Sequence, residues 1–288
     1  PRSFMTRKMS YDGYKKFVRI YPSFSKKLNH NIYLIADDKK NKITSKIFKN
    51  SMIKSKLKFN DYDVSKTNLK NITKAFDTNE RQIDHYKAKI FFKKRLKDNL
   101  FLSSNIKNIK KYKKKFKIKG EEFDYVINCT WQQSFKLSNL KLTYEHCAIS
   151  LYKSKILNHK SYTIMDGPYY TLLKWNKNLF ALYSVKDSRL CISKNYNKVK
   201  NSYLKFKRKD VTEIKENLSK GFIKFYPEFN KNFQFIKNLH SIRTISKNKK
   251  DARLCVVKQE NNFINIMSGK IDHIFFAFKE VLKCIKTY

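Results

Sequence analysis

Four consecutive segments in the middle of the chain are rich in β-branched and aromatic residues, and turn signals separate them. They cover residues 143–156, 161–165, 169–175 and 179–185, and the clearest turn is Asp166-Gly167-Pro168. Short strands joined by tight turns are typical of an antiparallel sheet. This predicted sheet constrains the fold most, because the apolar face of a sheet has to be covered by other elements.

Other parts of the chain show the spacing of helices or of single strands. We predict helices at residues 10–21, 83–96, 211–225, 229–239 and 271–285, and strands at 31–36, 116–118, 252–257 and 263–267. Residues 40–78 are polar and rich in lysine, and their weak periodicity predicts no defined element.

Residues 125–130 (YVINCT) follow Asp124 as an apolar run with almost no alternation between apolar and polar side chains. Such a run is typical of a strand that is buried on both faces, as strands of parallel sheets are. We therefore expect this strand to lie in a parallel sheet.

The chain carries 65 Lys and Arg residues against 23 Asp and Glu residues, a formal net charge of +42. A charge of this sign and size indicates a nucleic-acid or polyanion partner. However, only nine of the basic residues are arginine, whose fork reads phosphates and bases in a way that lysine cannot. The lysines are spread along the whole chain, and the abundance of Lys, Asn, Ile, Phe and Tyr is typical of an AT-rich genome. Codon bias is the favoured explanation, and a polyanion-binding surface stays open as the alternative.

Composition excludes several classes of protein. With 41% hydrophobic residues among 288, the chain can bury a sizeable core, which excludes a disordered arm. No run of residues reaches the roughly 18 apolar positions of a membrane span. Five cysteines without a C-x-x-C pair favour a reducing, cytoplasmic location over a disulfide scaffold or a zinc ribbon. No two of the six histidines are spaced i, i+4, so we expect no metal site.

Residues 124–130 (DYVINCT) resemble a flavin-domain signature of the D-amino-acid oxidase and glycine oxidase family of FAD-dependent oxidoreductases, whose strand reads D-x-V-I-N-C-T-G. Near the C-terminus, Ser241-Ile242-Arg243 stands where that family has G-x-R. Residues 262–271 stand where the family has its last strand and a glycine-rich turn before the closing helix. The order of the middle strands is similar to that of the family's substrate domain, so the resemblance covers roughly residues 80–288.

The sequence departs from the family pattern in three places. Trp131 replaces the glycine that follows the signature threonine, and Ser268-Gly269-Lys270 keeps one glycine of a richer turn. The third departure is the absence of the G-x-G-x-x-G turn that holds the FAD pyrophosphate. In the family that turn lies ahead of the position of Pro1. The resemblance thus implies a chain without roughly its first βαβ unit, which would bind FAD weakly by itself.

The resemblance implies an α/β fold, in which an incomplete, Rossmann-like FAD-binding domain carries an inserted and mostly antiparallel substrate-domain sheet. Residues 1–80 would form a helix-and-strand region that belongs partly to the substrate domain, and residues 81–140 would form part of the FAD-binding domain. Residues 141–240 would be the substrate domain, and residues 241–288 would return to the FAD-binding domain.

The resemblance also implies FAD as the cofactor and a small-molecule substrate, an amine or 2-amino-acid-like compound that gives hydride to the flavin. By resemblance, Arg243 clamps a substrate carboxylate, since a guanidinium can form two parallel hydrogen bonds with it. An ordinary surface arginine is the alternative. Tyr169 or Tyr170 is expected to donate a hydrogen bond to the same carboxylate, with packing in the core as the alternative.

Cofactor contacts are expected at two places, and no catalytic residue is assigned. The backbone of Asn128, Cys129 and Thr130 is expected near FAD, because the family's signature strand ends there. The second place is Ser268-Gly269-Lys270, which precedes a predicted helix. Free N–H groups and the positive end of the helix dipole would there face an anion such as the reduced flavin. An ordinary helix start after a turn is the alternative.

Two other functions stay open at this point. A lysine-rich nucleic-acid-binding protein would gather its lysines on one face and bind polyanions with a strong dependence on salt. A decayed member of the family would fold without flavin, as the missing glycine-rich turn and the changes at Trp131 and Ser268 suggest. The oligomeric state is open.

Overall fold

The computed structural model describes residues 3–39, 41–106, 108–135, 140–165, 169–246 and 253–286. The chain divides into two compact units, each assembled from separate stretches of sequence. The first unit consists mainly of residues 25–84 and 144–243, and the second takes the segments before, between and after them. The predicted turn Asp166-Gly167-Pro168 lies outside the described residues.

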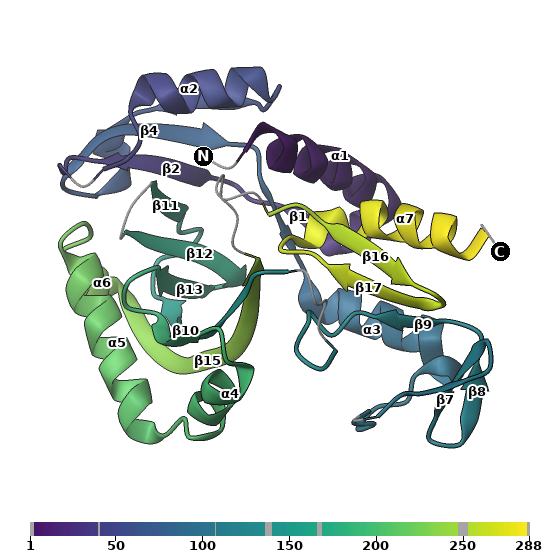
Figure 1. Cartoon of the computed structure of the whole chain (residues 1–288). Helices are drawn as coiled ribbons and strands as arrows, with labels where there is room; N and C mark the ends of the chain where they lie inside the picture. The colour runs from purple at the N-terminus through teal and green to yellow at the C-terminus, as the bar shows by residue number, and fades with distance from the viewer. Residues whose placement is uncertain are drawn as a thin grey trace. The chain divides into compact units, whose positions relative to one another are not determined.

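The first unit is built on a nine-stranded sheet (Figure 1). Its strand order is β14-β10-β13-β12-β11-β2-β4-β3, and β15 also pairs with β10. The strands are β2 (Asn31–Ala36), β3 (Phe59–Tyr62), β4 (Ile72–Thr78), β10 (Leu142–Ser154), β11 (Ser161–Met165), β12 (Tyr170–Asn176), β13 (Leu179–Ser184), β14 (Arg189–Ser193) and β15 (Phe233–Ser246). A separate short pair joins β1 (Ser25–Lys27) to β5 (Arg81–Ile83).

The four strands predicted in the middle of the chain form the antiparallel core of this sheet. β10 pairs with β13, β13 with β12 and β12 with β11, and each of these pairs is antiparallel. The exception is the pair of β2 with β11, which is parallel and aligns Ile32 with Tyr162. The N-terminal strand at residues 31–36, also predicted, is thereby built into the same sheet.

One face of this sheet is covered by α5 (Arg208–Ile223), which lies across it in green in Figure 1. Ile214, Leu218 and Phe222 are spaced by one helical turn and are buried against the sheet with the aromatic residues that follow the helix. This apolar stripe explains why the predicted helix at residues 211–225 forms. The short helices α4 (Tyr196–Leu204) and α6 (Phe229–Asn232) flank it.

Residues 40–78 contain defined elements that the sequence analysis missed. α2 (Ser45–Lys54) begins after Thr44, whose hydroxyl accepts a hydrogen bond from the Ile47 N–H. Its buried Phe48 stacks on Phe76 of β4 at 4.4 Å between ring centroids, in a second and smaller core. The helix has few apolar residues because only this narrow side of it is covered, so its periodicity is weak.

The predicted helix at residues 229–239 is wrong beyond its first turn. α6 ends at Asn232, and β15 runs from Phe233 to Ser246 and pairs with β10. Phe233 and Phe235 both pack against the main core, at the period of two that is typical of a strand. The aromatic residues before this strand continue the same core, which gave the segment a misleading helical spacing.

The second unit contains three longer helices and two small sheets. The helices are α1 (Phe4–Ile20), α3 (His85–Leu96) and α7 (Ile274–Lys286). One sheet is the antiparallel meander β6 (Lys110–Tyr112), β7 (Lys115–Ile118) and β8 (Glu121–Phe123). The other has the order β16-β17-β9, from β16 (Val256–Glu260), β17 (Phe263–Met267) and β9 (Val126–Asn128). No helix in the described part of the chain is long and apolar enough to span a membrane.

The signature strand β9 is parallel to β17, with Val126 opposite Phe263 and Asn128 opposite Asn265. The prediction of a parallel strand is therefore confirmed. The expected burial on both faces is wrong, because Ile127 is 43% exposed. The strand predicted at residues 252–257 begins four residues later and ends three residues later, as β16.

α1 begins at Phe4, six residues before the predicted start, because Ser3 caps its N-terminus and accepts a hydrogen bond from Thr6 N–H. Gly13 in the middle of α1 lies against the backbone of Asp272. A Cβ atom at this position would lie 1.7 Å from the Asp272 carbonyl oxygen. α1 and the turn before α7 therefore pack backbone to backbone.

Candidate functional site

Two clusters of polar side chains contain the residues that the sequence analysis predicted, one in each unit. In the first unit, Arg243 near the end of β15 lies beside Glu145 of β10. Its Nε and Nη2 both lie 2.6 Å from Glu145 Oε2. The other carboxylate oxygen, Oε1, lies 3.5 Å from Nη1 of Arg189, the first residue of β14. We call Glu145, Arg189 and Arg243 the arginine cluster.

Glu145 is the buried member of the arginine cluster, with 5% of its surface exposed. A buried carboxylate is costly unless it is paired and hydrogen-bonded, and here two guanidinium groups pair with it. The thiol of Cys147 lies 3.8 Å from Glu145 Oε2 as a further donor. Burial raises the pKa of that thiol to about 11, so the thiol keeps its proton near neutral pH.

Sequence reasoning singled out Arg243 and missed both of its neighbours. A signal was present in each case. Glu145 is an acidic residue inside an otherwise apolar strand segment, and Arg189 is one of only nine arginines in a chain with 56 lysines. Two of these rare arginines meet at one carboxylate.

The structure places Tyr169 and Tyr170 in the main core. Both are more than 90% buried, and both rings contact Phe225 behind α5. The Tyr170 hydroxyl donates a hydrogen bond to Asp187 Oδ2 at 2.7 Å. A Cβ on Gly221 would collide with this hydroxyl, so the ring fits closely against the helix. These contacts favour the core-packing interpretation of the two tyrosines.

The second cluster lies in the second unit, where β9 and β17 end. Because the two strands are parallel and adjacent, the residues that follow them meet at one edge of the sheet. We call the residues 128–131 after β9 and 268–270 after β17 the sheet-edge cluster. The structure thus brings together the two groups that were predicted separately as cofactor contacts, at the edge where open parallel sheets bind ligands.

The Asn128 side chain is fixed inside the sheet-edge cluster. It is buried, and its Nδ2 donates to Asn265 Oδ1 at 2.7 Å and to the Phe135 carbonyl at 2.8 Å. Its Oδ1 accepts from both the N–H and the hydroxyl of Thr130. Thr130 and Cys129 are exposed. Asn128 therefore shapes the turn, while the two residues after it face outward.

Trp131 occupies the position of the family glycine with a glycine-like backbone. Its φ is 56°, and Gln132 follows with 60°, both in the left-handed region that L-residues rarely adopt. The indole N–H of Trp131 is buried and has no hydrogen-bond partner among the described residues. A large residue therefore holds a backbone conformation that glycine adopts most readily.

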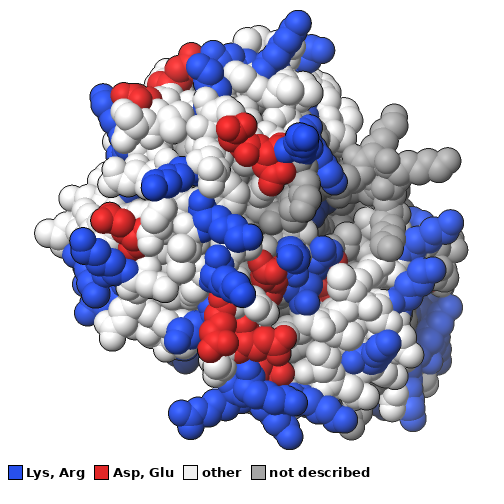
Figure 2. Space-filling model, turned by 90° about the vertical axis from the view of Figure 1, so that its left-hand side faces the viewer, with Lys and Arg blue, Asp and Glu red and all other residues white. Residues whose placement is uncertain are grey.

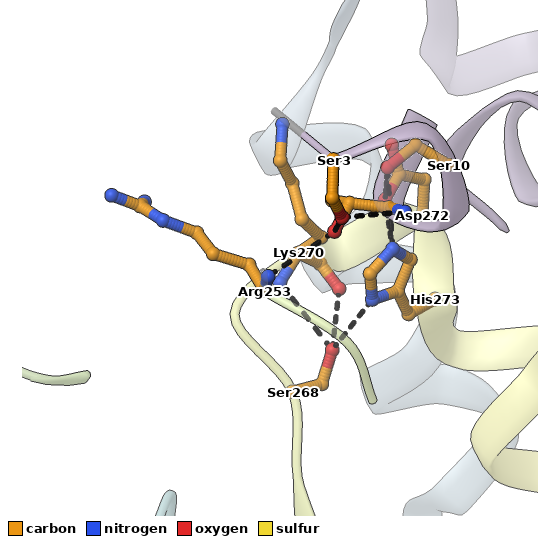
Figure 3. Close-up of polar contacts among 8 residues, drawn as sticks. Ser3, Ser10, Arg253, Ser268, Lys270, Asp272 and His273 are labelled. Carbon is orange, nitrogen blue, oxygen red and sulfur yellow. Dashed lines mark hydrogen bonds and ion pairs between the residues drawn. The ribbon is translucent and has the colours of Figure 1, made fainter. Parts of the chain in front are cut away.

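Ser268, Gly269 and Lys270 lead into a 3-10 turn, Ile271–His273, and α7 begins only at Ile274. The predicted helix start is therefore one turn further along the chain. The Ser268 hydroxyl donates to the Lys270 carbonyl at 2.9 Å and lies 3.4 Å from His273 Nδ1. Figure 3 shows the Arg253 side chain extending away from these residues.

A buried histidine fixes this turn to α1. His273 is fully buried, and its Nε2 lies 3.2 Å from the Ser10 hydroxyl, which also donates to Asp272 Oδ1 (Figure 3). Burial lowers the pKa of His273. Together with the close approach of Gly13, these bonds hold the sheet-edge cluster in one position relative to α1.

The basic residues do not form one continuous patch on the face drawn in Figure 2. There, Lys and Arg side chains are interspersed with Asp and Glu side chains and with uncharged surface. A nucleic-acid-binding surface would gather its lysines on one face, so this face does not favour that alternative.

No family model matches the chain. The FAD-dependent monooxygenase FPY4 of Fusarium mangiferae is 26% identical over 281 residues, which cover 97% of this chain and 75% of that protein. The comparisons give no support to the nucleic-acid-binding alternative.

Solved structures share the fold at low sequence identity. L-proline dehydrogenase from P. horikoshii matches with a TM-score of 0.63 at 12% identity, over 93% of this chain and 75% of that one. Glycine oxidase from Geobacillus kaustophilus matches with a TM-score of 0.62 at 9% identity, over 94% and 74%. The predicted α/β fold with its inserted antiparallel sheet is confirmed. The chain is thus similar in sequence to an FAD-dependent monooxygenase, and it shares its fold with an L-proline dehydrogenase and a glycine oxidase of known structure.

Proposed function

We propose that this protein is an FAD-dependent oxidoreductase that oxidises a small amine or 2-amino acid, by removing hydride from the carbon next to the nitrogen. The observation that carries the substrate class is the arginine cluster, whose two arginines and one glutamate have a net charge of +1. Similar folds belong to enzymes named for proline and glycine, two amino acids with a carboxylate. A guanidinium is well suited to orient such a carboxylate.

The sheet-edge cluster has donors that fit the ring system of FAD. The indole N–H of Trp131 has no hydrogen-bond partner among the described residues and is available to a carbonyl or ring-nitrogen acceptor, whereas the Thr130 N–H and hydroxyl are already bonded to Asn128. Lys270 is exposed beside them and carries a positive charge. None of the five glycines of the sequence stands in a G-x-G-x-x-G turn, so no residue is assigned to the pyrophosphate.

When bound, FAD supplies the two-electron acceptor that no protein side chain provides. The residues of the chain then have separate tasks. Arg243 holds the substrate carboxylate and sets the direction of its reacting C–H bond. Lys270 would place a positive charge near the ring system, a position from which it could stabilise an anion. Asn128 keeps the turn after β9 in the conformation that presents Trp131 and Thr130.

The test is a titration of the purified full chain with FAD, followed by anaerobic addition of glycine, proline and a carboxylate-free amine. We expect weak but saturable FAD binding, and bleaching of the flavin absorbance by an amine that carries a carboxylate. Arg243→Ala is expected to weaken the reaction with that amine while FAD affinity stays unchanged. Absence of FAD binding at saturating concentration would overturn the proposal and leave the decayed family member.

Oxygen insertion is the second candidate reaction, and the name of the Fusarium relative favours it. The two reactions differ in their products. Dehydrogenation gives an imine that takes its oxygen from water on hydrolysis, whereas monooxygenation transfers an oxygen atom from dioxygen. Mass spectrometry of products formed under isotopically labelled dioxygen distinguishes them, because only monooxygenation carries the label into the product.

A further inference from the structure

Each oxygen of Glu145 faces a different arginine. Oε2 accepts hydrogen bonds from Nε and Nη2 of Arg243, both at 2.6 Å, and Oε1 lies 3.5 Å from Nη1 of Arg189. The three residues come from β10, β14 and β15, so the carboxylate is the contact that joins the two guanidinium groups. With one buried anion between two cations, the cluster keeps one unit of positive charge.

Both arginines keep donors that Glu145 does not use. Arg243 binds the carboxylate through one side of its fork, and its Nη1 makes no hydrogen bond to the described residues. Arg189 donates from Nε to the Val185 carbonyl, which leaves its Nη2. Their side chains are 25% and 31% exposed, so these donors can reach a ligand.

Tyr183 of β13 adds a third donor next to Arg243. The Arg243 guanidinium lies over its ring, 5.7 Å from the centroid. The tyrosine hydroxyl is buried and makes no well-aligned hydrogen bond to the described residues. Burial raises its pKa, so the hydroxyl is protonated and can donate. The buried hydroxyl beside Arg243 is a further donor that a bound anion could use.

From these contacts we infer that Glu145 positions Arg189 and Arg243 as a pair, and that the pair binds the substrate carboxylate. The inference rests on the proposed function for the identity of the ligand as substrate, and it adds Arg189 as a second binding residue and Glu145 as a positioning residue. Two guanidinium groups held at one carboxylate offer an anion more donors, at fixed angles, than Arg243 alone does.

A competing interpretation is that Glu145 only neutralises Arg243 and closes the site to anions. The two interpretations predict opposite signs for Glu145→Gln, which raises the charge of the cluster from +1 to +2 without a large change of shape. If Glu145 only neutralises, an added positive charge strengthens anion binding. If Glu145 positions the pair, the arginines lose their common partner and anion binding weakens.

The experiment measures binding of cyclohexanecarboxylate to the full chain by isothermal titration calorimetry, with the neutral amide of the same shape as a comparison ligand. We expect the carboxylate to bind and the amide not to bind. Arg189→Gln should weaken carboxylate binding about tenfold or more, the effect of one charge-assisted hydrogen bond. Arg208→Gln, which removes an exposed arginine at the start of α5, is the matched control and should leave binding unchanged.

Glu145→Gln should weaken binding by a similar factor, and tighter binding would overturn the positioning role. If this variant does not fold, Arg189→Lys replaces it, because lysine keeps the charge and loses the fork. If Arg189→Lys binds the carboxylate as tightly as the wild type does, the inference that the two arginines bind it as a pair is wrong. An FAD titration in parallel separates the two claims. If the chain binds FAD but its affinity for the carboxylate does not change in Arg189→Gln, the inference is wrong and the proposed function stands. If the chain does not bind FAD but its affinity for the carboxylate does depend on Arg189, the proposed function is wrong and the inference of an anion-binding pair stands.

Discussion

The arginine cluster and the sheet-edge cluster fix their polar groups by different means. In the arginine cluster, charged side chains from three strands meet at Glu145, and the sequence separations between them are large. In the sheet-edge cluster, neutral amides and backbone groups bond across two adjacent strands, as Asn128 does with Asn265. The arginine cluster depends on ion pairing to a buried carboxylate, and the sheet-edge cluster depends on strand register.

This difference predicts which substitutions destabilise each cluster most. Removing one member of a buried ion pair leaves an uncompensated charge, whereas removing a neutral amide leaves an unsatisfied hydrogen bond, which costs less. The two units should therefore respond differently to core substitutions, to acid and to loss of a single polar group.

The largest effect is expected from Phe222→Ala, which empties a fully buried site between α5 and the sheet of the first unit. A loss of about 3–5 kcal/mol in the free energy of unfolding is typical of such a change. Hydrogen exchange should accelerate in β12 and stay unchanged in β17, if the units unfold separately. Lys220→Ala on the exposed side of α5 is the control. Equal acceleration in both strands would break the comparison, because it would make the units one cooperative body.

Acid should weaken the first unit more than the second. Burial, with the nearby His240, lowers the pKa of His146 from 6.5 to about 4, and burial also lowers the pKa of His159 and His240. In the second unit, burial lowers the pKa of His273. Between pH 6.5 and 4 the unfolded chain binds a proton that the folded His146 does not bind, so stability falls as the pH falls. His146 alone should contribute on the order of 2–3 kcal/mol.

Urea unfolding at pH 7 and at pH 4.5, followed by hydrogen exchange in each unit, measures this effect. His146→Gln removes the titrating group, so its stability should depend less on pH than that of the wild type. The same pH dependence in both proteins would show that His146 does not carry the effect. His30, which is exposed at the surface, provides the control position for a His→Gln change.

Asn128→Ala tests the sheet-edge cluster. The substitution leaves Asn265 Oδ1 and the Thr130 N–H without their partner, and we expect a loss of about 1–3 kcal/mol in the second unit. The FAD affinity of the full chain should fall with it, because the turn that presents Trp131 is released. Ser134→Ala, at an exposed position in the same turn region, is the control. Unchanged FAD affinity in a destabilised variant would make Asn128 purely structural.

The smallest effect is expected from Tyr170→Phe, which removes one hydrogen bond to Asp187. Stability should fall by about 0.5–1.5 kcal/mol, and the KM for an amine substrate should stay unchanged, because the ring lies in the core. A raised KM at unchanged stability would instead restore the predicted contact between this tyrosine and the substrate carboxylate.

Much of the first unit could be predicted from local pattern. The strands at residues 143–185 are rich in β-branched and aromatic residues, and α5 has an apolar stripe, because these elements supply most of the main core. Residues 40–78 could not be predicted, since α2 buries little more than Phe48. β15 was mistaken for a helix because its strand character depends on pairing with β10, which lies far away in the sequence.

The candidate site was predictable in the same uneven way. The sheet-edge residues were singled out from a local motif, and Trp131 in that motif has a left-handed backbone. Glu145 and Arg189 belong to no local motif, because their contact arises only when β14 and β15 both pair with β10. Tyr169 and Tyr170 follow a predicted turn in the sequence. That position does not reveal whether their rings are buried in the core or face a ligand.

The parallel pair of β9 and β17 also governs the order in which the protein is completed during synthesis. The sheet of the first unit contains only strands that precede residue 247, whereas β9 has to wait for β17 near the C-terminus. A growing chain can therefore close the inserted unit while the surrounding one still lacks a strand and exposes the edge of β9. α1 is in the same position, because Gly13 packs on Asp272, which is made even later. α1 is therefore made long before the residue on which it packs.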